Sequence, residues 1–323
     1  MEPSKTVARP GHETSATPRW RIEPDGAEMH KLLSIIAIPF LAAACAAPGT
    51  SGVASPAPLS SPTGSSPGTY AVETGTNKLI LQEREGGGFV APQSQLANMP
   101  TFALYGDGRI IVPGPVDAIY PGPLLPNLRA SYVTPAEIQK ILAAADAAGL
   151  LGPDASYDAT GVADLGTTTF TVVVEGKVHT ISAYALSADF KSGNPAVDTA
   201  RARLIAFGDD LANLPGFLGR DVPDQAYEPL AMRVFVGPAE MTSTGITPQV
   251  VEWPLALDPA TAGQPAAVAN LRCIALTGTD LTTFLAAART ANSATIWMAA
   301  SGRYSVTVRP LYPEESGCPS TAG

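Results

Sequence analysis

Apolar and polar positions alternate along several short stretches of the chain, which is the pattern of strands with one buried face. The segment Lys78–Glu85 (KLILQERE) alternates in this way. In Thr101–Val112 (TFALYGDGRIIV), two apolar runs flank Asp107-Gly108, a pair that favours a hairpin turn. A second hairpin is expected where TTTFTVVV and KVHTISAY flank Glu175-Gly176.

Two segments of the first half carry helical signals instead. The residues Thr134-Pro135-Ala136-Glu137 form a capping box with proline at the first helical position. The helix that follows is expected to end at Gly149 and to bury the residues at helical spacing, Ile138, Ile141, Leu142 and Ala145. Asn194-Pro195 opens a second helix, expected to reach about Leu214.

The second half has a similar order of elements. Strands are expected at Pro229–Val236 (PLAMRVFV) and in VVEWPLAL, followed by a helix over 280–291. A hairpin, ATIWMAA and RYSVTVRPL, then turns at Ser301-Gly302. The pattern predicts an α+β fold with antiparallel sheets and a few packed helices, divided into units 77–215 and 216–323. Their shared order of strand, helix and hairpin indicates either a duplication or chance, because no residue-level repeat supports it.

Before the first strand, the chain carries the three-part pattern of a secretory signal. Met29, His30 and Lys31 give a positively chargeable start, and an apolar run follows over residues 32–44. This run is too short to span about 30 Å of hydrocarbon as a helix. It ends in LAAAC, which resembles the lipobox of bacterial lipoproteins, with Ala42 where leucine is usual. The resemblance implies that Cys45 receives a diacylglycerol and becomes the first residue of the mature protein. The alternatives are an ordinary secretory signal, or an accidental apolar run in a cytosolic protein.

The segments on either side of this signal have simple interpretations. Residues 1–28 are polar, mixed in charge and without apolar period, so we interpret them as an over-extended start before Met29. Residues 29–44 are then the signal peptide. Residues 45–76 hold the lipidated cysteine and a tether rich in Pro, Ser, Gly and Ala, which is typical of a flexible linker.

Composition narrows the class of protein. The 323 residues are 45% hydrophobic and 15% charged, with a formal net charge of −9. Such an acidic chain lacks the basic face of a nucleic-acid binder, and its apolar fraction can supply a core. A coiled coil and a multi-span membrane protein are excluded as well. Attraction to anionic lipid cannot anchor the chain, so acyl chains must do so, at about 0.8 kcal/mol for each buried methylene.

Of the three cysteines, Cys273 and Cys318 remain as a pair once Cys45 carries lipid. Outside the cytoplasm such a pair is expected to form a disulfide. In the chain-entropy treatment this bond would stabilise the fold by about 3–4 kcal/mol. The alternative is two buried free thiols. Neither cysteine has a histidine or a basic cluster near it in sequence, so no thiol catalysis is expected.

The phrases LPNLR, LAAADAAGLLGPDASYD and ADLGTTTFTV, with the closing RPLYPEESGC, resemble a group of uncharacterised lipoproteins from high-GC bacteria. The resemblance covers most of residues 77–318. It implies a single fold outside the cytoplasmic membrane. It implies no activity, because the group has none assigned.

No catalytic motif for nucleophilic chemistry is present in the sequence. Neither a G-x-S-x-G elbow nor an S-x-x-K occurs, and His179 is the single histidine after Cys45. We expect His179 to be a pairing residue on a strand. Ser187 and Lys191 could form a Ser–Lys pair, but nothing nearby lowers the pKa of the lysine. Zinc is disfavoured by the shortage of ligands, and Gly86-Gly87-Gly88 lacks the features of a phosphate loop.

Three aspartates, Asp154, Asp158 and Asp164, cluster in the loop DASYDATGVAD. Oxygen-rich loops suit Ca²⁺, which takes six to eight oxygen ligands. The EF-hand pattern fails, because Ala159 stands at the glycine position and Leu165 at the bidentate position. A looser Ca²⁺ loop or a carboxylate pair for hydrolysis remains open, and so do plain turn-forming aspartates.

Two further features of the sequence bear on ligand binding. The proline-rich segment Pro113–Asn127 is too broken for a helix or strand, and it is either a packed connector or, with Tyr120 and Tyr132, a surface for a peptide or glycan. Arg309, in the closing RPLY, is expected to pair with an Asp or Glu.

The sequence as a whole predicts a lipid-anchored protein on the extracytoplasmic face of a bacterial membrane. We expect its role to be that of a non-catalytic binding or accessory ectodomain without a cofactor. Its expected partners are the membrane, through the N-terminal lipid, and an envelope protein or glycan, with no nucleic acid. The alternative is an envelope hydrolase or Ca²⁺-binding protein that uses loop carboxylates, and a spacer without ligand is a third possibility.

Overall fold

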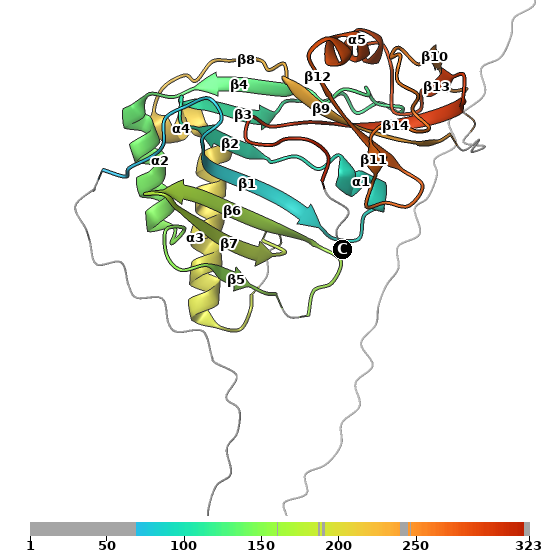
Figure 1. Cartoon of the computed structure of the whole chain (residues 1–323). Coiled ribbons are helices and arrows are strands. Elements are labelled where there is room, and N and C mark those ends of the chain that lie inside the picture. The colour runs from blue at the N-terminus through green and yellow to red at the C-terminus, as the bar shows by residue number, and fades with distance from the viewer. Residues whose placement is uncertain are drawn as a thin grey trace, which may run out of the picture. The chain divides into compact units, whose positions relative to one another are not determined.

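The computed structural model describes residues 69–159, 161–186, 188, 191–239, 245 and 247–319. The interpretations of residues 1–28, of the signal peptide at 29–44, of Cys45 and of most of the tether therefore lie outside the described residues. The α+β fold is confirmed. Two sheets form, one of eight strands and one of six, with a few helices packed against them (Figure 1).

The eight-stranded sheet is antiparallel throughout, except that β5 and β7 at one edge pair in parallel. In spatial order its strands are β5 (Ala155–Tyr157), β7 (Lys177–Tyr184), β6 (Gly166–Val174), β1 (Leu79–Gly87), β2 (Phe102–Tyr105), β3 (Arg109–Pro113), β4 (Leu128–Tyr132) and β8 (Asp224–Ala226). Three helices cover one face of this sheet and bury the larger apolar core between them and the strands (Figure 1): α2 (Pro135–Ala147), α3 (Pro195–Ala212) and α4 (Leu214–Leu218).

The six-stranded sheet is also antiparallel, except that β10 and β13 at its edge pair in parallel. Its strands in spatial order are β10 (Val250–Glu252), β13 (Ile296–Ala299), β14 (Gly302–Pro310), β9 (Ala231–Pro238), β12 (Arg272–Thr277) and β11 (Gln264–Pro265). The helix α5 (Gly278–Ala288) packs on it, and Phe284 of α5 stacks on Trp297 of β13 in the core. The short helix α1 (Pro92–Leu96) lies between β1 and β2 in the chain.

The two halves have a similar order of elements along the chain, but their strands are connected differently. In the first sheet, β1 pairs with β6, which is the first strand of the β6–β7 hairpin. In the second sheet, β9 pairs with β14, which is the second strand of the β13–β14 hairpin. The first sheet also takes β8 from residues after Pro215. The similar order of elements in the two halves therefore leads to different connections.

The helix α2 shows how closely local sequence sets local structure. The Thr134 hydroxyl accepts a hydrogen bond from the Glu137 amide, and the Glu137 carboxylate accepts one from the Thr134 amide at 2.7 Å. This is the predicted capping box. The four residues that α2 buries are the four that the spacing indicates, Ile138, Ile141, Leu142 and Ala145. The helix ends at Ala147, and Gly149, two residues later, has a φ of 91°.

The turn between β2 and β3 depends on a glycine. Gly108 has a φ of 82°, and its amide donates to the carbonyl of Tyr105 at 2.9 Å. A Cβ atom at this position would collide with the carbonyl oxygen of Val133, whose amide donates to the Gly108 carbonyl. The predicted hairpin at Asp107-Gly108 is thus confirmed, and the turn is also the contact that holds the end of β4.

The proline-rich segment Pro113–Asn127 links the two cores. Its first part is exposed, with Tyr120 73% accessible. Its second part crosses to the other sheet, where the Leu124 amide donates to the Ala291 carbonyl at 3.1 Å and the Ser293 amide donates to the Gly122 carbonyl at 2.8 Å. The Leu124 side chain is buried in the core of the second sheet. Both sheets lie within one compact unit of the chain, and this segment is one reason.

The substitution Leu124→Ala tests this link. We expect it to lower the free energy of unfolding by about 2–3 kcal/mol, because it removes a buried side chain from the core of the second sheet. That side chain belongs to the first half of the chain, so the loss measures the link between the halves. Urea denaturation measures the change. Val116→Ala, in the exposed part of the same segment, is the control and should change stability by no more than about 0.5 kcal/mol. Equal effects of the two substitutions would contradict the assignment.

Candidate functional site

The last described residues, 311–319, form a C-terminal segment that lies on the first sheet. Along β2, Phe102 and Leu104 belong to the core under the helices, whereas Tyr105 packs with Tyr312 in a separate small core. Because side chains alternate along a strand, Tyr312 lies on the face opposite to the helices. Tyr312 is 1% exposed, and its hydroxyl donates to the Pro100 carbonyl at 3.2 Å. The segment therefore covers the second face of the first sheet.

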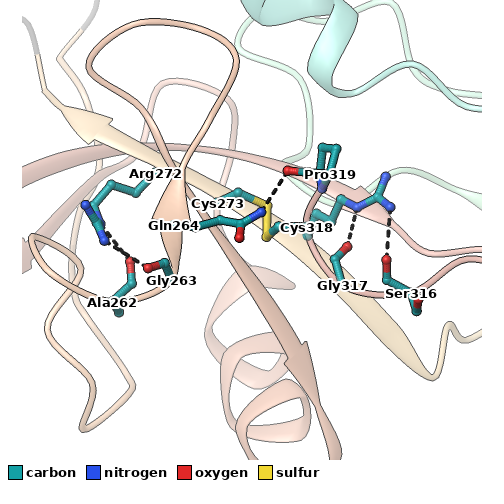
Figure 2. Close-up of a disulfide and its surroundings, with 10 residues drawn as sticks. Ala262, Gly263, Gln264, Arg272, Cys273, Ser316, Gly317, Cys318 and Pro319 are labelled. Atoms are coloured by element: carbon teal, nitrogen blue, oxygen red, sulfur yellow. Dashed lines mark hydrogen bonds between the residues drawn. A yellow bond between two sulfur atoms is a disulfide. The ribbon is translucent and has the colours of Figure 1, made fainter. Parts of the chain in front are cut away.

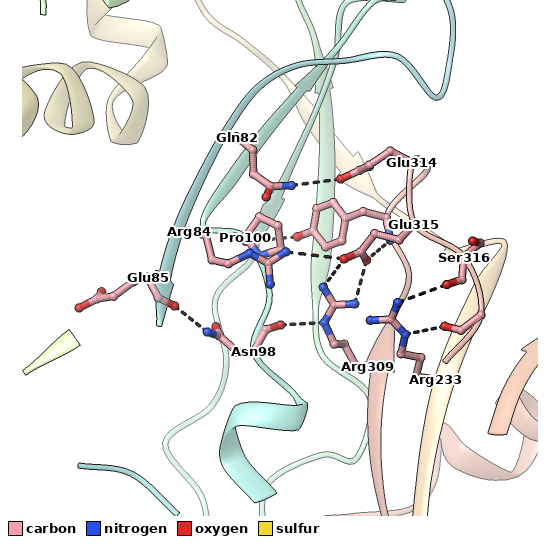
Figure 3. A network of polar contacts seen from close by, with 12 residues as sticks. Gln82, Arg84, Glu85, Asn98, Pro100, Arg233, Arg309, Glu314, Glu315 and Ser316 are labelled. Atoms are coloured by element: carbon pink, nitrogen blue, oxygen red, sulfur yellow. Dashed lines mark hydrogen bonds and ion pairs between the residues drawn. The ribbon is translucent and has the colours of Figure 1, made fainter. Parts of the chain in front are cut away.

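A buried ion pair fixes this segment, as Figure 3 shows. Arg309, at the end of β14, donates two hydrogen bonds to Glu315, at 2.8 Å and 2.6 Å, and is only 4% exposed. Its Nε donates to the Asn98 carbonyl at 2.7 Å. The Glu315 carboxylate also accepts the Tyr312 amide at 3.0 Å and lies 3.6 Å from Arg84. The expected pairing of Arg309 with an acidic residue is confirmed, and bidentate pairing of this kind is the strongest geometry for it.

In this cluster, arginine side chains outnumber carboxylates. Burial lowers the pKa of Arg84 and of Arg233, and Arg309 lowers both further. Burial alone would raise the pKa of Glu315, but the hydrogen bonds from Arg309 and the Tyr312 amide outweigh it and lower the pKa overall. Three guanidinium groups thus act on the Glu315 carboxylate, and the neighbouring Glu314 carboxylate accepts hydrogen bonds from Gln82 at 3.1 Å and from Tyr105 at 2.7 Å. The arrangement is suited to holding the segment in place.

The predicted disulfide between Cys273 and Cys318 is confirmed (Figure 2). It joins residues 45 positions apart, with a Cα–Cα distance of 5.9 Å, within the usual range. Around it, side chains of the second sheet hold backbone carbonyls of the segment: Arg233 donates to Gly317 at 2.6 Å, and Gln264 donates to Pro319 at 2.7 Å. The C-terminal segment is thereby attached to both sheets.

The helical face of the first sheet contains a half-open cavity of about 380 Å³, here called the Glu83 cleft. Its sheet side consists mainly of apolar side chains, Phe102, Ile110 and Val112. Its helix side comes from the end of α3 and from α4, with Leu211, Leu214 and Pro215. Four polar residues also line it, Glu83, Thr101, Ser131 and Asp224. A mostly apolar cleft with a few polar groups is the usual form of a small-molecule site.

Glu83 is the most unusual polar group of this cleft. Burial raises the pKa of its carboxyl, the Thr101 side chain lowers it, and Glu85 and Asp209 raise it again, so that the pKa lies above the ordinary value. None of the ion pairs among the described residues includes Glu83. A carboxyl group with a raised pKa in a cleft is a candidate functional group.

Gly208, in the interior of α3, lies beside this carboxyl group. A Cβ atom at Gly208 would lie 3.4 Å from Oε1 of Glu83. Glycine inside a helix costs about 0.5–1 kcal/mol relative to alanine. The carboxyl group of Glu83 thus lies against helix backbone that carries no side chain.

The three aspartates of the predicted Ca²⁺ loop are not brought together. Asp154 accepts the Thr180 amide at 2.8 Å, and Asp164 has a φ of 64° and accepts the Phe89 amide at 3.1 Å through its carbonyl. All three side chains are exposed. Within the described ranges, no group of three or more His, Cys, Asp or Glu residues could hold a metal ion. Asp154 and Asp164 here have the contacts of turn-forming residues.

The other candidates are scattered. His179 lies on β7, half-buried, with Nδ1 2.9 Å from the Gly152 carbonyl, so it belongs to a strand as expected. Ser187 lies outside the described residues, so its pairing with Lys191 stays untested. Tyr120 and Tyr132 are both exposed, on the proline-rich segment and on β4.

Sequence reasoning missed Glu83 and the carboxylate partner of Arg309. A signal for Glu83 exists, because in the alternating run Lys78–Glu85 it falls two positions after Leu81, on the face that packs under the helices. For Glu315 the signal was proximity, since it lies six residues after Arg309. Neither signal distinguishes a buried from a solvated carboxylate.

No protein-family model, curated protein sequence or solved structure matches this chain. Its class is therefore defined by the structure alone, as a disulfide-linked α+β fold of two packed sheets. Among the helices that the structure describes, none has both the length and the apolar character needed to cross a bilayer.

The substitution Glu315→Gln tests the ion pair. Above pH 6 we expect the free energy of unfolding to fall by about 2–4 kcal/mol, because Arg309 is left buried without a charged partner. The pKa of Glu315 is lowered in the folded state, so its stabilisation is complete above the unfolded value of about 4.3 and is lost as the pH falls through the folded value. The gap between wild type and variant should therefore shrink below about pH 4.

Denaturant unfolding at pH 7, 5 and 3 measures both effects. Glu175→Gln, at an exposed hairpin turn, is the matched control and should differ little from wild type at each pH. If Glu315→Gln behaved like this control, the ion pair would not be the contact that holds the segment.

Proposed function

We propose that this chain is a lipid-anchored protein of the bacterial cell envelope, whose α+β ectodomain binds a partner on the extracytoplasmic side without catalysing a reaction. The lipobox-like LAAAC at Cys45 and the tether that follows suggest the anchor. An envelope protein or a glycan is the partner class that suits this location.

The observation that carries the proposal is the disulfide between Cys273 and Cys318. Disulfides persist in oxidising compartments and are rare in the cytosol. Here the bond fastens the segment that carries Tyr312 and Glu315, and so an oxidising environment supports the fold itself. A cytosolic location would leave this attachment to the ion pair and the small core alone.

A binding role is favoured by how the polar groups are used. The paired groups, such as Arg309 with Glu315 and Arg129 with Asp224, stabilise the fold. The Glu83 cleft and the exposed part of the proline-rich segment, with Val116, Ile119 and Tyr120, are two surfaces available for a ligand.

One prediction of this proposal concerns the mature N-terminus. When the full-length gene is expressed in a bacterium with lipoprotein processing, we expect the membrane fraction to hold a chain that begins at Cys45 and carries diacylglycerol. Mass spectrometry of the N-terminal peptide measures this. Cys45→Ser, the matched control, should lose the lipid and leave the membrane fraction. An unmodified peptide that begins at Met1 would contradict the anchor.

A second prediction concerns the thiols of the same protein. Alkylation of the denatured, unreduced chain should label none of its three cysteines, because Cys45 carries lipid and the other two are bonded. After reduction, two should be labelled, Cys273 and Cys318. Three labelled cysteines without reduction would place the chain in a reducing compartment and overturn the proposal.

A further inference from the structure

We infer that the Glu83 cleft binds a small organic cation, a primary ammonium group on an apolar stem. The inference goes beyond the proposed function, because it assigns a ligand class to a particular cavity and does not depend on the lipid anchor. The inference follows from the shape of the cleft and from a carboxyl group at one end of it that has no ion-pair partner among the described residues. It also follows from the number of acceptors in the cleft, which is too small for other kinds of cation.

The cleft is elongated across the strands. Glu83 of β1 pairs in register with Phe102 of β2, and on the other side of β3, Ser131 of β4 pairs with Asp224 of β8. From β1 to β4 is three strand spacings, about 14 Å. Between these ends lie Phe102, Ile110 and Val112, with Leu211 and Leu214 on the helix side. Such a path suits a narrow hydrocarbon stem that lies along the apolar side chains.

The charge at the Glu83 end is not balanced by the protein. The charged neighbours that act on Glu83 are Glu85 of its own strand and Asp209 of α3, both acidic. Asp224, at the far end, is already paired with Arg129 at 3.0 Å. A carboxylate withdrawn from water is unfavourable unless an opposite charge or a proton accompanies it. A cationic ligand that enters the cleft would supply that charge.

The kind of cation follows from the groups present. A hard metal ion such as Ca²⁺ takes six to eight oxygens, whereas no group of three or more ligating side chains exists among the described residues. A guanidinium presents five donors, and an ammonium presents three. The Glu83 carboxylate and the Thr101 hydroxyl, which donates to the backbone carbonyl of Glu83 at 3.2 Å, offer few acceptors, so the ammonium is the better match.

The ligand test uses the full chain, purified, at pH 7. Titration calorimetry with n-hexylammonium should show saturable binding at one site, and 1-hexanol, which has the same stem without the charge, should bind at least tenfold more weakly. n-Butylammonium should bind several-fold more weakly than the hexyl compound, because its stem covers less of the apolar side. Nα-acetyl-lysine methylamide, which carries the same ammonium group, tests whether the source is a lysine side chain of a partner; tighter binding than n-hexylammonium would identify that source.

Two variants locate the site. Glu83→Gln should weaken n-hexylammonium binding at least tenfold, whereas Glu85→Gln, an exposed carboxylate on the same strand, should change it less than twofold. Ala212→Trp should abolish binding without changing the unfolding transition, because Ala212 is exposed and lines the cleft. This second variant keeps the test valid if Glu83→Gln does not fold.

Three results would overturn the inference. They are no saturable binding of n-hexylammonium or of the lysine compound, equal affinity for the amine and the alcohol, or unchanged binding by Glu83→Gln together with Ala212→Trp.

Discussion

The burial of the Arg309 guanidinium is the constraint on which the rest of this structure depends. A cation that is 4% exposed requires a carboxylate, and here the carboxylate comes from a residue six positions later. The chain must therefore turn back after β14, and the Glu315 amide donates to the Tyr312 carbonyl at 2.9 Å within this turn. That path presses Tyr312 against Tyr105 of the first sheet and delivers Cys318 to Cys273 of the second. One ion pair thus determines where the two sheets meet the end of the chain.

The joining of the halves is reciprocal. The C-terminal segment, which follows the second sheet in sequence, covers a face of the first sheet with Tyr312. The proline-rich segment, which belongs to the first half, places Leu124 in the core of the second. Because each half contributes a buried residue to a core of the other, unfolding is expected to be cooperative across both. This exchange explains why two units with separate sheets form one compact body.

The features predicted from sequence are those whose cause lies within a few residues. The capping box at Thr134, the turn at Gly108 and the four buried positions of α2 depend on neighbours along the chain, and all are found in the structure. The features missed depend on distant partners. The strand β12 (RCIALT) gave no clear signal because four apolar residues follow one another from Cys273 to Leu276, although Ala275 of this run is exposed. In VVEWPLAL the strand stops after three residues, since Pro254 has no amide to donate and Trp253 turns into the core. The destination of Leu124 and the surroundings of Glu83 could not be predicted, because each is set by residues far along the chain.

The distribution of charge connects this architecture to a ligand. The chain carries nine more acidic than basic residues, and its guanidiniums are largely engaged in holding elements together, as Arg220 holds Glu137 and Arg129 holds Asp224. In such a chain, few basic side chains are left to form an ion pair with a half-buried carboxyl group. Glu83 is in this position, beside Gly208 of α3. The negative net charge also draws cations toward the surface. A shortage of cations in the composition and an open apolar cleft on the sheet therefore lead to the same expectation, that the missing charge is brought by something that binds.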